Sequence, residues 1–561
     1  MLPMQGSQQL SSPTLWVILS SLFHRKRNPM RRLCFAALVL SLAASAAAQT
    51  VPATPQDARA IRAFNAAKVN PLRLHAFLAN MPKGADLHMH LSGAIYAETF
   101  LANAAADHLC VNTTTLSLVK NIGTTRSLPP QPVCAEGNVA AASAFQDQKL
   151  YDALVDSFSM RSFVPTPGTS GHDQFFATFA RFGSVEKSHV AEWLDEVATR
   201  SAAQNGQYLE IMQTPVFSAS AKLGYQLGWP EVPSDPIGQH RDATPAELAH
   251  LRDQLLAGGL RDEVAADRKE LDDALAARQQ IEHCDQPNAR AACSVKIRFL
   301  AQVLRAFPPQ QVFAQTLLYF ELASVDPNVV GINFVQPEDA YMAMSEYHRQ
   351  MLMLDYLHSV YPKVHISLHA GELAPGLVPP DGLAFHIREA VDLGHAERIG
   401  HGVDVMYERD PAALLKELAD RHVMVEINLT SNDGILGITG KNHPLPAYRA
   451  AHVPVALSTD DEGVSRGNIT QEYTRAALEF NLSYLDLKNM ARTGLEHSFL
   501  AGPSLWLQQD NFARPVAACA AQPLGSEKPT TRCTDYLKSS DKAAQQWELE
   551  HRFQVFESTI H

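Results

Sequence analysis

The sequence predicts an α/β fold: a (β/α)8 barrel of the TIM type, with insertions and with helical extensions at both ends. Two observations predict it. Eight short apolar runs rich in β-branched residues follow one another along the chain, and the segments between the later runs have helical character. Strands that alternate with helices form a parallel sheet, and eight such units predict a closed barrel. With 561 residues and 46% hydrophobic composition, the chain can bury a core of this size.

The strands are expected in an uneven series along the chain. In order, they are Ala85–Leu91, Gln207–Gln213, Ser294–Leu300, Val329–Val335, Val364–Ala370, Arg398–Val403, Val423–Leu429 and Val453–Thr459. Helix-like stretches such as Phe385–Leu393 and Pro411–His422 separate the later ones. An open, doubly wound sheet is the alternative, but no G-x-G-x-x-G motif follows an early strand.

The uneven spacing divides the chain. We expect the barrel over residues 81–505, with insertions at about 104–150 and 215–293. A helical segment over residues 49–80 precedes it, and residues 506–561 form a C-terminal extension. The preceding helical segment is either a dimerisation arm, which would make the protein a homodimer, or a plain packing helix.

The first 48 residues have the pattern of a cleaved signal peptide. Five basic residues precede an apolar run over residues 33–43, and Ala46-Ala47-Ala48 offers an A-x-A cleavage site. Met30 is an alternative start to Met1, because everything the signal needs lies after it. A membrane anchor is the other interpretation, but the run is short for a span of about 20 residues. The leader predicts a secreted or periplasmic protein with no stable membrane anchor after cleavage.

Charge and cysteine usage agree with export and with a small-molecule substrate. Removing the leader takes away five Lys/Arg and no Asp/Glu, which leaves 42 basic against 59 acidic residues, a net charge of −17. So acidic a protein is a poor candidate for binding nucleic acid. Cys34 leaves with the leader, and the other six cysteines form three local pairs: 110 with 134, 284 with 293, and 519 with 533. An even number in an exported chain suggests disulfides, although six cysteines allow fifteen connectivities.

Polar residues gather where the expected strands end, and barrel active sites form at that rim. The first strand carries His88 and His90, whose alternation points both imidazoles to the same side. The fifth ends in His369 with Glu372 close behind, the sixth carries His401, and the eighth ends in Asp460 and Asp461. Each alone reads equally well as a buried histidine, a capping acid or a turn. Three imidazoles and a carboxylate together suit zinc with one position left for water. Glu372 can then move protons, His401 can orient the water, and Asp461 can bind the substrate.

Five motifs in succession resemble those of adenosine deaminases, in the metal-dependent amidohydrolase superfamily. They are PKGADLHMHLSGA, SLHAGE, RIGHGV, EINLTSN and VALSTDDE, between Met81 and Ser504. With its leader and insertions, the chain is most similar to the secreted, growth-factor-like or periplasmic branch. The resemblance implies one zinc ion per chain on His88, His90, His369 and Asp460. It implies that Glu372 donates a proton to the purine, that His401 and Asp461 hold the attacking hydroxide, and that adenosine or 2′-deoxyadenosine becomes inosine or its 2′-deoxy form plus ammonia.

Two positions depart from the family pattern. Ser92 stands where an acidic residue commonly contacts the ribose, and Gln336 stands where a glycine lies near the purine. The expected substrate-binding residues are therefore His90, Ser92, Gln336 and Asp461. The departures keep open a deaminase or amide hydrolase with another amino-purine substrate. A non-catalytic nucleoside-binding protein is disfavoured, because the metal and proton-transfer residues are all present. The H-x-E/P-C-x-x-C pattern of cytidine-type deaminases and the H-E-x-x-H pattern of zinc proteases are both absent.

Overall fold

The computed structural model describes residues 55–126, 131–185, 187–230 and 242–560. The expected signal peptide, Cys34 and both candidate start residues lie outside this part of the chain. Eight parallel strands form one sheet in which spatial order follows chain order. They are β1 (Gly84–His90), β5 (Gly206–Gln213), β6 (Lys296–Leu304), β7 (Val329–Val335), β8 (His365–Ala370), β9 (Arg398–His401), β10 (Met424–Ile427) and β11 (Val455–Leu457). All eight expected strands are confirmed.

The sheet curls until its two edge strands meet. Met89 of β1 forms a parallel bridge with Asp460, which follows β11. The backbone N–H of Asp460 donates to the carbonyl of His88 at 2.8 Å. The ends of β1 and β11 are thereby joined, and the barrel is nearly closed. This closure brings residues almost four hundred positions apart in the sequence to the same point of the rim.

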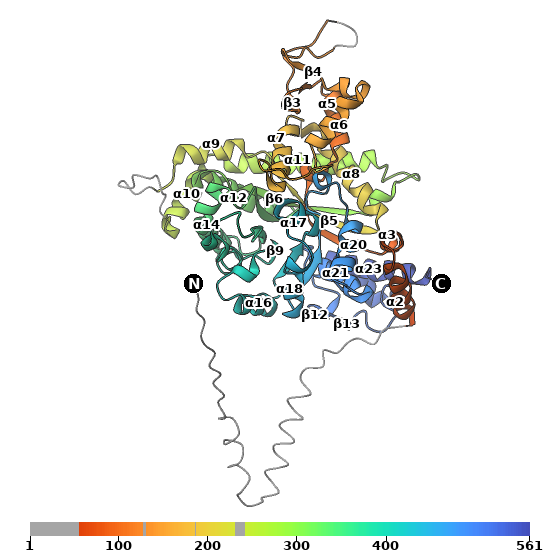
Figure 1. The fold of residues 1–561 in the computed structure, drawn as a ribbon. Coiled ribbons are helices and arrows are strands. Elements are labelled where there is room, and N and C mark those ends of the chain that lie inside the picture. Colours follow the sequence, from red (N-terminus) through yellow and green to blue (C-terminus); the bar gives the residue numbers. More distant parts are fainter. Residues whose placement is uncertain (1–54, 127–130, 186, 231–241, 561) are drawn as a thin grey trace, which may run out of the picture. The chain divides into compact units, whose positions relative to one another are not determined.

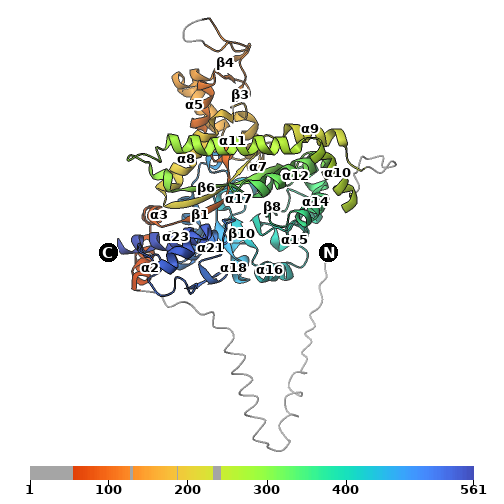
Figure 2. The ribbon, with the colours of Figure 1, turned by 180° about the vertical axis from the view of Figure 1, so that it is seen from behind.

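Helices cover the outside of the barrel (Figures 1 and 2). Among the helices that connect successive strands or follow the last one are α8 (Val190–Ala203), α12 (Pro309–Val325), α14 (Tyr347–Val360), α15 (His386–Asp392), α16 (Pro411–Asp420), α17 (Leu429–Leu436), α18 (Leu445–Ala450), α20 (Ile469–Glu479) and α21 (Tyr484–Glu496). The two helical stretches expected from the sequence correspond to α15 and α16. Apolar side chains of these helices, such as Leu317, Leu354 and Leu418, are fully buried against the strands.

Residues between β1 and α8 build a separate lobe at one end of the folded unit (Figure 1). It contains α5 (Ala97–Ala106), α6 (Gln148–Ser157) and a small antiparallel sheet of β2 (Cys110–Asn112), β3 (Ser117–Val119) and β4 (Asn138–Ala140). Helix α7 (Gly171–Phe182) leads back toward the barrel and begins at a capping box between Ser170 and Asp173. The disulfide Cys110–Cys134 closes the lobe's loop.

The segment between β5 and β6 is helical. It contains α9 (Ser218–Leu227), α10 (Pro245–Ala257) and α11 (Leu260–Ile281). Helices α10 and α11 are separated at Gly259, which adopts a φ of +100° that a residue with a side chain rarely has. The disulfide Cys284–Cys293 follows α11.

The two ends of the described chain pack beside each other. Helices α2 (Pro55–Lys68) and α3 (Pro71–Asn80) precede β1, and the C-terminal region contains β12 (Trp506–Gln508), β13 (Asn511–Pro515), α22 (Thr531–Lys538) and α23 (Asp541–Ser558). Lys488 of α21 binds Asp57 of α2 at 3.0 Å and Glu557 of α23 at 2.5 Å. The third disulfide joins Cys519 and Cys533. All three cysteine pairs are as expected. Among the described helices, none is both long and apolar enough to cross a bilayer.

Candidate metal centre and active site

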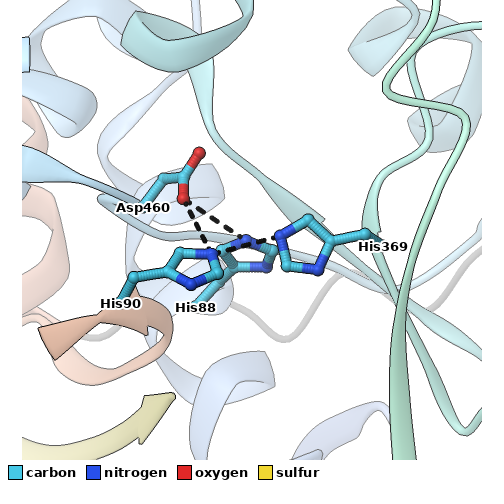
Figure 3. Close-up of side chains that lie close together, drawn as sticks. All are labelled: His88, His90, His369 and Asp460. Carbon is cyan, nitrogen blue, oxygen red and sulfur yellow. Dashed lines mark hydrogen bonds and ion pairs between the residues drawn. The ribbon is translucent and has the colours of Figure 1, made fainter. Parts of the chain in front are cut away.

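Four expected metal ligands meet at the rim where β1, β8 and β11 end. His88 and His90 come from β1, His369 comes from β8, and Asp460 follows β11. Their side chains point toward one another (Figure 3). One ligand atom from each lies within 4.8 Å of the others. Two residues apart on one strand, His88 and His90 face the same side, as the alternation of a strand requires.

The distances between these atoms suit the ligands of one zinc ion. The Nε2 atoms of His90 and His369 are 3.2 Å apart. Oδ1 of Asp460 lies 3.3 Å from Nε2 of His90 and 3.6 Å from Nε2 of His88. Zinc bonds of about 2.0–2.1 Å bring the ligand atoms of one ion to within about 3–4 Å of one another. Nε2 of His88 and Oδ1 of Asp460 are buried without a hydrogen-bond partner among the described residues. The donor set therefore fits zinc in type, number and spacing.

Each histidine of the set is oriented from behind by a different strand. Nδ1 of His88 donates to Glu426 at 2.6 Å, and Nδ1 of His369 donates to Asn333 at 2.7 Å. Nδ1 of His90 donates to Gln302 at 2.5 Å. When Nδ1 carries the proton, Nε2 presents its lone pair to the centre, which is how outer partners orient metal-binding imidazoles.

The charge around the set favours a cation. Burial lowers the pKa of His369 well below its ordinary value, and the neighbouring His88 and His90 lower it further. Burial also lowers the pKa of His90. In contrast, the pKa of His88 is raised to about 10, because Asp460 and Glu426 together outweigh the effect of burial. Two carboxylates on either side of one imidazole make a positive charge favourable at this point.

The three expected catalytic residues lie beside the ligands. Oε1 of Glu372 is 3.5 Å from Nδ1 of His401, and Nε2 of His401 is 3.8 Å from Oδ2 of Asp460. Asn432 donates to Nδ1 of His401 at 2.9 Å, which leaves the ring proton on Nε2, facing Asp460. Asp461 follows directly, and a Cβ on Gly93 would lie only 1.5 Å from its Oδ1. A glycine is thus required at position 93 for Asp461 to occupy its place.

Burial sets the protonation of these groups. The pKa of Glu372 is raised well above its ordinary value, first by burial and then by the charge of Asp460. The pKa of Asp461 is raised in the same way by burial and by Asp460. Burial lowers the pKa of His401 to about 3, so its ring is neutral at physiological pH. A buried carboxyl group whose pKa is raised holds its proton to a higher pH and is suited to act as an acid.

A cavity of about 440 Å³ opens above the cluster. His90, His369, Glu372, Asp460 and Asp461 line its floor. Aromatic rings from α7 line one side, and they belong to Phe175, Phe176 and Phe179. The two positions that depart from the family pattern, Ser92 and Gln336, both line the cavity. The structure therefore brings together every residue that the sequence singled out, with His88 and His401 fully buried beneath the cavity.

Gln336 is fixed within this wall. Its backbone has a φ of +86°, a conformation that favours glycine. Its Oε1 accepts from the backbone N–H of Ala306 at 2.9 Å, and its carbonyl accepts from Arg305 at 3.2 Å. The side chain thus occupies a place at the cavity edge that a glycine would leave open.

Sequence reasoning missed the residues behind the ligands and the aromatic wall. Glu426 carried a signal, since it is an acid inside an otherwise apolar strand. Gln302 was missed because the third strand was expected to end at Leu300, whereas β6 continues to Leu304. The α7 phenylalanines carried no signal, because an apolar helix face equally indicates packing in the core.

The chain matches a known family over more than half of its length. The family described as "Adenosine deaminase" matches residues 173–505. The chain belongs to the adenosine deaminase family, in the amidohydrolase superfamily. The matched span begins after β1, so His88 and His90 lie outside it. Their place in the family's site rests on the geometry above, where they face His369 and Asp460.

Individual relatives are similar over shorter stretches. An adenosine deaminase of Clostridium perfringens is 32% identical over 135 residues, 24% of this chain and 37% of that protein. An adenine deaminase of Sinorhizobium fredii is 29% identical over 217 residues, 38% of this chain and 61% of that protein. The chain thus spans less than two thirds of the length of either relative.

A solved structure shares the fold. An amidohydrolase from Burkholderia ambifaria, crystallised with bound zinc, superimposes with a TM-score of 0.50 at 16% identity. The match covers 87% of this chain and 94% of that one. At this level of identity the likeness concerns the barrel alone.

Proposed function

We propose that the protein is a zinc-dependent deaminase that hydrolyses adenosine to inosine and ammonia, and 2′-deoxyadenosine to 2′-deoxyinosine and ammonia. One observation carries the proposal. Four zinc-type ligand atoms converge beside Glu372, a buried carboxyl group whose pKa is raised well above its ordinary value by burial and by Asp460. The ligands for a metal and the acid that hydrolytic removal of an amino group needs thus lie next to each other beneath one cavity.

His88, His90, His369 and Asp460 would hold the zinc ion. A zinc ion in such a site lowers the pKa of water toward about 7 and so supplies hydroxide at neutral pH. The zinc in the Burkholderia amidohydrolase is in keeping with this choice of metal. The three bonds from Nδ1 to Glu426, Asn333 and Gln302 keep the imidazoles in the required orientation.

The remaining groups of the chain carry the proton transfers. Glu372 donates its proton to the ring nitrogen next to the attacked carbon. His401, neutral and held by Asn432, points its Nε2–H toward Asp460 and fixes the direction of attack. Asp461 binds the hydroxide and the purine. In the reaction a C–O bond forms between the hydroxide and the purine carbon, the proton of the new hydroxyl group passes to the amino group, and the C–N bond breaks to release ammonia and leave a carbonyl. The other proton of the water replaces the one that Glu372 has given to the ring nitrogen.

The cavity wall favours a nucleoside over a nucleotide. Three phenylalanine rings offer an apolar face against which a base can stack. Among the described residues that line the cavity, none is a lysine or an arginine. A phosphate group needs such cations when it leaves water. Ser92 and Gln336 are polar groups that can bind sugar hydroxyls, and a cavity of about 440 Å³ is within the usual range for small-molecule sites.

A second amino-purine, including the free base, is the alternative substrate. Gln336 favours it, because its side chain fills the cavity edge where the family pattern has glycine. The adenine deaminase among the relatives is in keeping with such a substrate.

A substrate panel tests the proposal. Purified protein is loaded with zinc and given adenosine, 2′-deoxyadenosine, adenine or adenosine monophosphate, and conversion is followed by the absorbance change of the purine. We expect turnover of the two nucleosides and little of the nucleotide. Turnover of adenine alone would move the assignment to the alternative. No turnover of any amino-purine by a folded, zinc-loaded sample would contradict the proposed function.

We also propose that the protein is exported, to the periplasm or outside the cell. Three disulfides within the described residues support this, because they persist in oxidising compartments. Fractionation of producing cells checks it. Mature protein that begins near residue 49 outside the cytoplasm is the expected result, and full-length protein confined to the cytoplasm would contradict it.

A further inference from the structure

The end of β8 and the turn that follows it carry two of the site's groups, His369 and Glu372; residues 369–372 are called the turn below. Charged side chains from the two preceding strand ends hold its backbone. Arg305, just after β6, donates to the carbonyl of His369 at 3.1 Å. Glu338, beyond the end of β7, accepts the backbone N–H of Gly371 at 3.0 Å and that of Glu372 at 2.8 Å. Three backbone groups within four residues are therefore held from outside the turn.

The groups that hold the turn are buried. Arg305 and Glu338 are each 1% exposed, and neither lines the cavity. Glu338 also accepts from Nδ1 of His386 at 2.5 Å, and the His386 ring stacks on Tyr347 with centroids 4.0 Å apart. Arg305 donates in addition to the carbonyl of Gln336, so it joins the ends of β7 and β8. Removing such charges from water costs several kcal/mol per ion, so stability alone is a weak reason for their presence.

The turn has little freedom to relax. Gly371 adopts a φ of +76°, and a Cβ at this position would lie 2.3 Å from Oδ1 of Asp404. The backbone of Gly371 thus lies directly against Asp404, in the loop after β9, and is bound by Glu338 on its other side. Within this frame the carboxyl group of Glu372 is placed 3.5 Å from His401.

We propose that Arg305 and Glu338 are positioning residues, which fix the His369–Glu372 turn so that the ligand and the acid face the same point of the cavity. Neither touches the reacting atoms. Arg305 holds the backbone carbonyl of the metal ligand His369, and Glu338 holds the backbone N–H of Glu372. His386 in turn keeps Glu338 in place. The expected loss of activity in these variants rests on the proposed function. The expected faster loss of zinc does not, because it is independent of the substrate.

The central experiment compares two buried glutamates that differ in what they hold. Glu338→Gln keeps the shape of the side chain but exchanges one carboxylate oxygen for an NH2 group. One backbone N–H of the turn then faces this second donor and loses its hydrogen bond. Glu408→Gln is the matched control. Glu408 is 4% exposed and accepts two backbone N–H groups, at 2.7 and 3.3 Å, but both belong to the start of α15 and not to the turn.

We measure kcat and KM for adenosine, the rate at which a chelator removes zinc, and the melting temperature of the zinc-loaded proteins. Loss of an outer partner of a metal site typically costs 10–100-fold in affinity or activity. We therefore expect Glu338→Gln to lower kcat by about 10–100-fold with KM within about threefold, and to release zinc at least about tenfold faster. Glu408→Gln should lower the melting temperature to a similar degree and leave kcat and zinc release unchanged.

A second variant tests the same inference in case Glu338→Gln does not fold. Arg305→Lys keeps the charge, but a single ammonium lacks the planar fork that reaches the carbonyls of His369 and Gln336 together. We expect Arg305→Lys to lower kcat and to speed zinc release as well, but by less than Glu338→Gln does.

Two results would overturn the inference. Either kcat and zinc release stay at wild-type values in both turn variants, or they change as much in Glu408→Gln, which would mean that general stability is responsible. If the wild-type protein does not deaminate adenosine, the proposed function fails and zinc release alone decides the inference. Faster release in Glu338→Gln than in Glu408→Gln supports it, and equal release overturns it.

Discussion

Two buried glutamates beside the metal centre have pKa values shifted in opposite directions. Glu426, on β10, is fully buried, and both its oxygens are bonded: Oε2 to His88, and Oε1 to Arg398 at 2.6 Å and Ser367 at 3.0 Å. Its pKa is about 2, because Arg398 and His88 outweigh the effect of burial. Glu372 is 8% exposed, and its Oε1 has no hydrogen-bond partner among the described residues. Its pKa is raised well above the ordinary value by burial and by Asp460.

The difference shows how one barrel gives the same residue type two tasks. Beneath the cavity, Arg398 lies between Glu210 and Glu426, at 2.7 and 2.6 Å, and stacks 3.8 Å from the centre of the Phe499 ring. A carboxylate with such a partner stays charged and orients a ligand. At the rim no lysine or arginine among the described residues forms an ion pair with Glu372, and burial together with Asp460 raises its pKa, so this carboxyl group holds its proton more readily and can give it away. Partnering, and not depth of burial, separates the orienting acid from the reacting one.

Replacing the reacting acid should have the largest effect. We expect Glu372→Gln to lower kcat by about 10²–10⁴-fold, the usual contribution of a general acid, because an amide cannot deliver the proton. Zinc content should stay near one per chain, since the four ligands are untouched. Steady-state kinetics and metal analysis on one sample check this. Stoichiometric zinc with undiminished turnover would show that Glu372 is not the acid.

Removing the guanidinium group of Arg398 beneath the site should destabilise the protein, because it leaves the charge of Glu426 buried and unpaired. Arg398→Met leaves Glu426 buried without its main partner, and breaking a buried pair costs about 3–5 kcal/mol. The measurement is the denaturation midpoint in urea as a function of pH. In the wild-type protein the pKa of Glu426 is depressed from 4.5 to about 2, so its stabilisation is present above pH 4.5 and is lost as the pH falls toward 2. The gap between wild type and variant should therefore be full at pH 7 and narrow below about pH 4.5. A gap independent of pH would show that lost packing is the cause.

Replacing the orienting acid should have a smaller effect than replacing the reacting one. Glu426→Gln can keep a bond to His88 but removes the charge, and such changes typically cost 10–100-fold in metal affinity or activity. We expect faster zinc removal by a chelator, with activity restored when zinc is added in excess. An equal loss of kcat at saturating zinc in Glu426→Gln and Glu372→Gln would remove the distinction between the two acids.

The smallest change is expected at the cavity edge. Gln336→Gly gives the backbone a residue that accepts a φ of +86° and opens the wall. We expect a several-fold change in the ratio of kcat/KM for adenosine to that for adenine, with zinc content unchanged, because differences of a few atoms in a pocket are worth about 10–200-fold at most. An unchanged ratio across the substrate panel would show that Gln336 does not select the substrate.

The sequence was sufficient for those parts of the molecule that depend on local pattern. Eight apolar runs gave eight strands, and the rule that the carboxyl ends of parallel strands meet at one rim brought His88, His369 and Asp460 together. The pairing of the cysteines followed from their proximity along the chain. Breaks within helices were harder to place, as at Gly259, since a single glycine does not by itself end a helix.

The outer partners could not be predicted, because they depend on the register between strands. Gln302 interrupts an apolar run, so it reads as the end of a strand, although it points inward to a polar site. Arg305 and Glu338 act on the backbone of a third segment, and no pattern in sequence records such a contact. The protonation of Glu372 depends on which charges surround it in space. Burial and the charge of Asp460 raise its pKa, and both follow only from the folded arrangement.

The central claim is that one zinc ion on these four ligands makes the chain an adenosine-hydrolysing enzyme. The most direct measurement is a titration of metal-free protein with zinc, in which adenosine turnover is followed at each addition. The account predicts activity that rises linearly and stops at one zinc per chain, and a His88→Ala variant that stays inactive because it does not retain the ion. Full turnover in the metal-free protein, or a zinc-loaded protein that never converts adenosine, would contradict it.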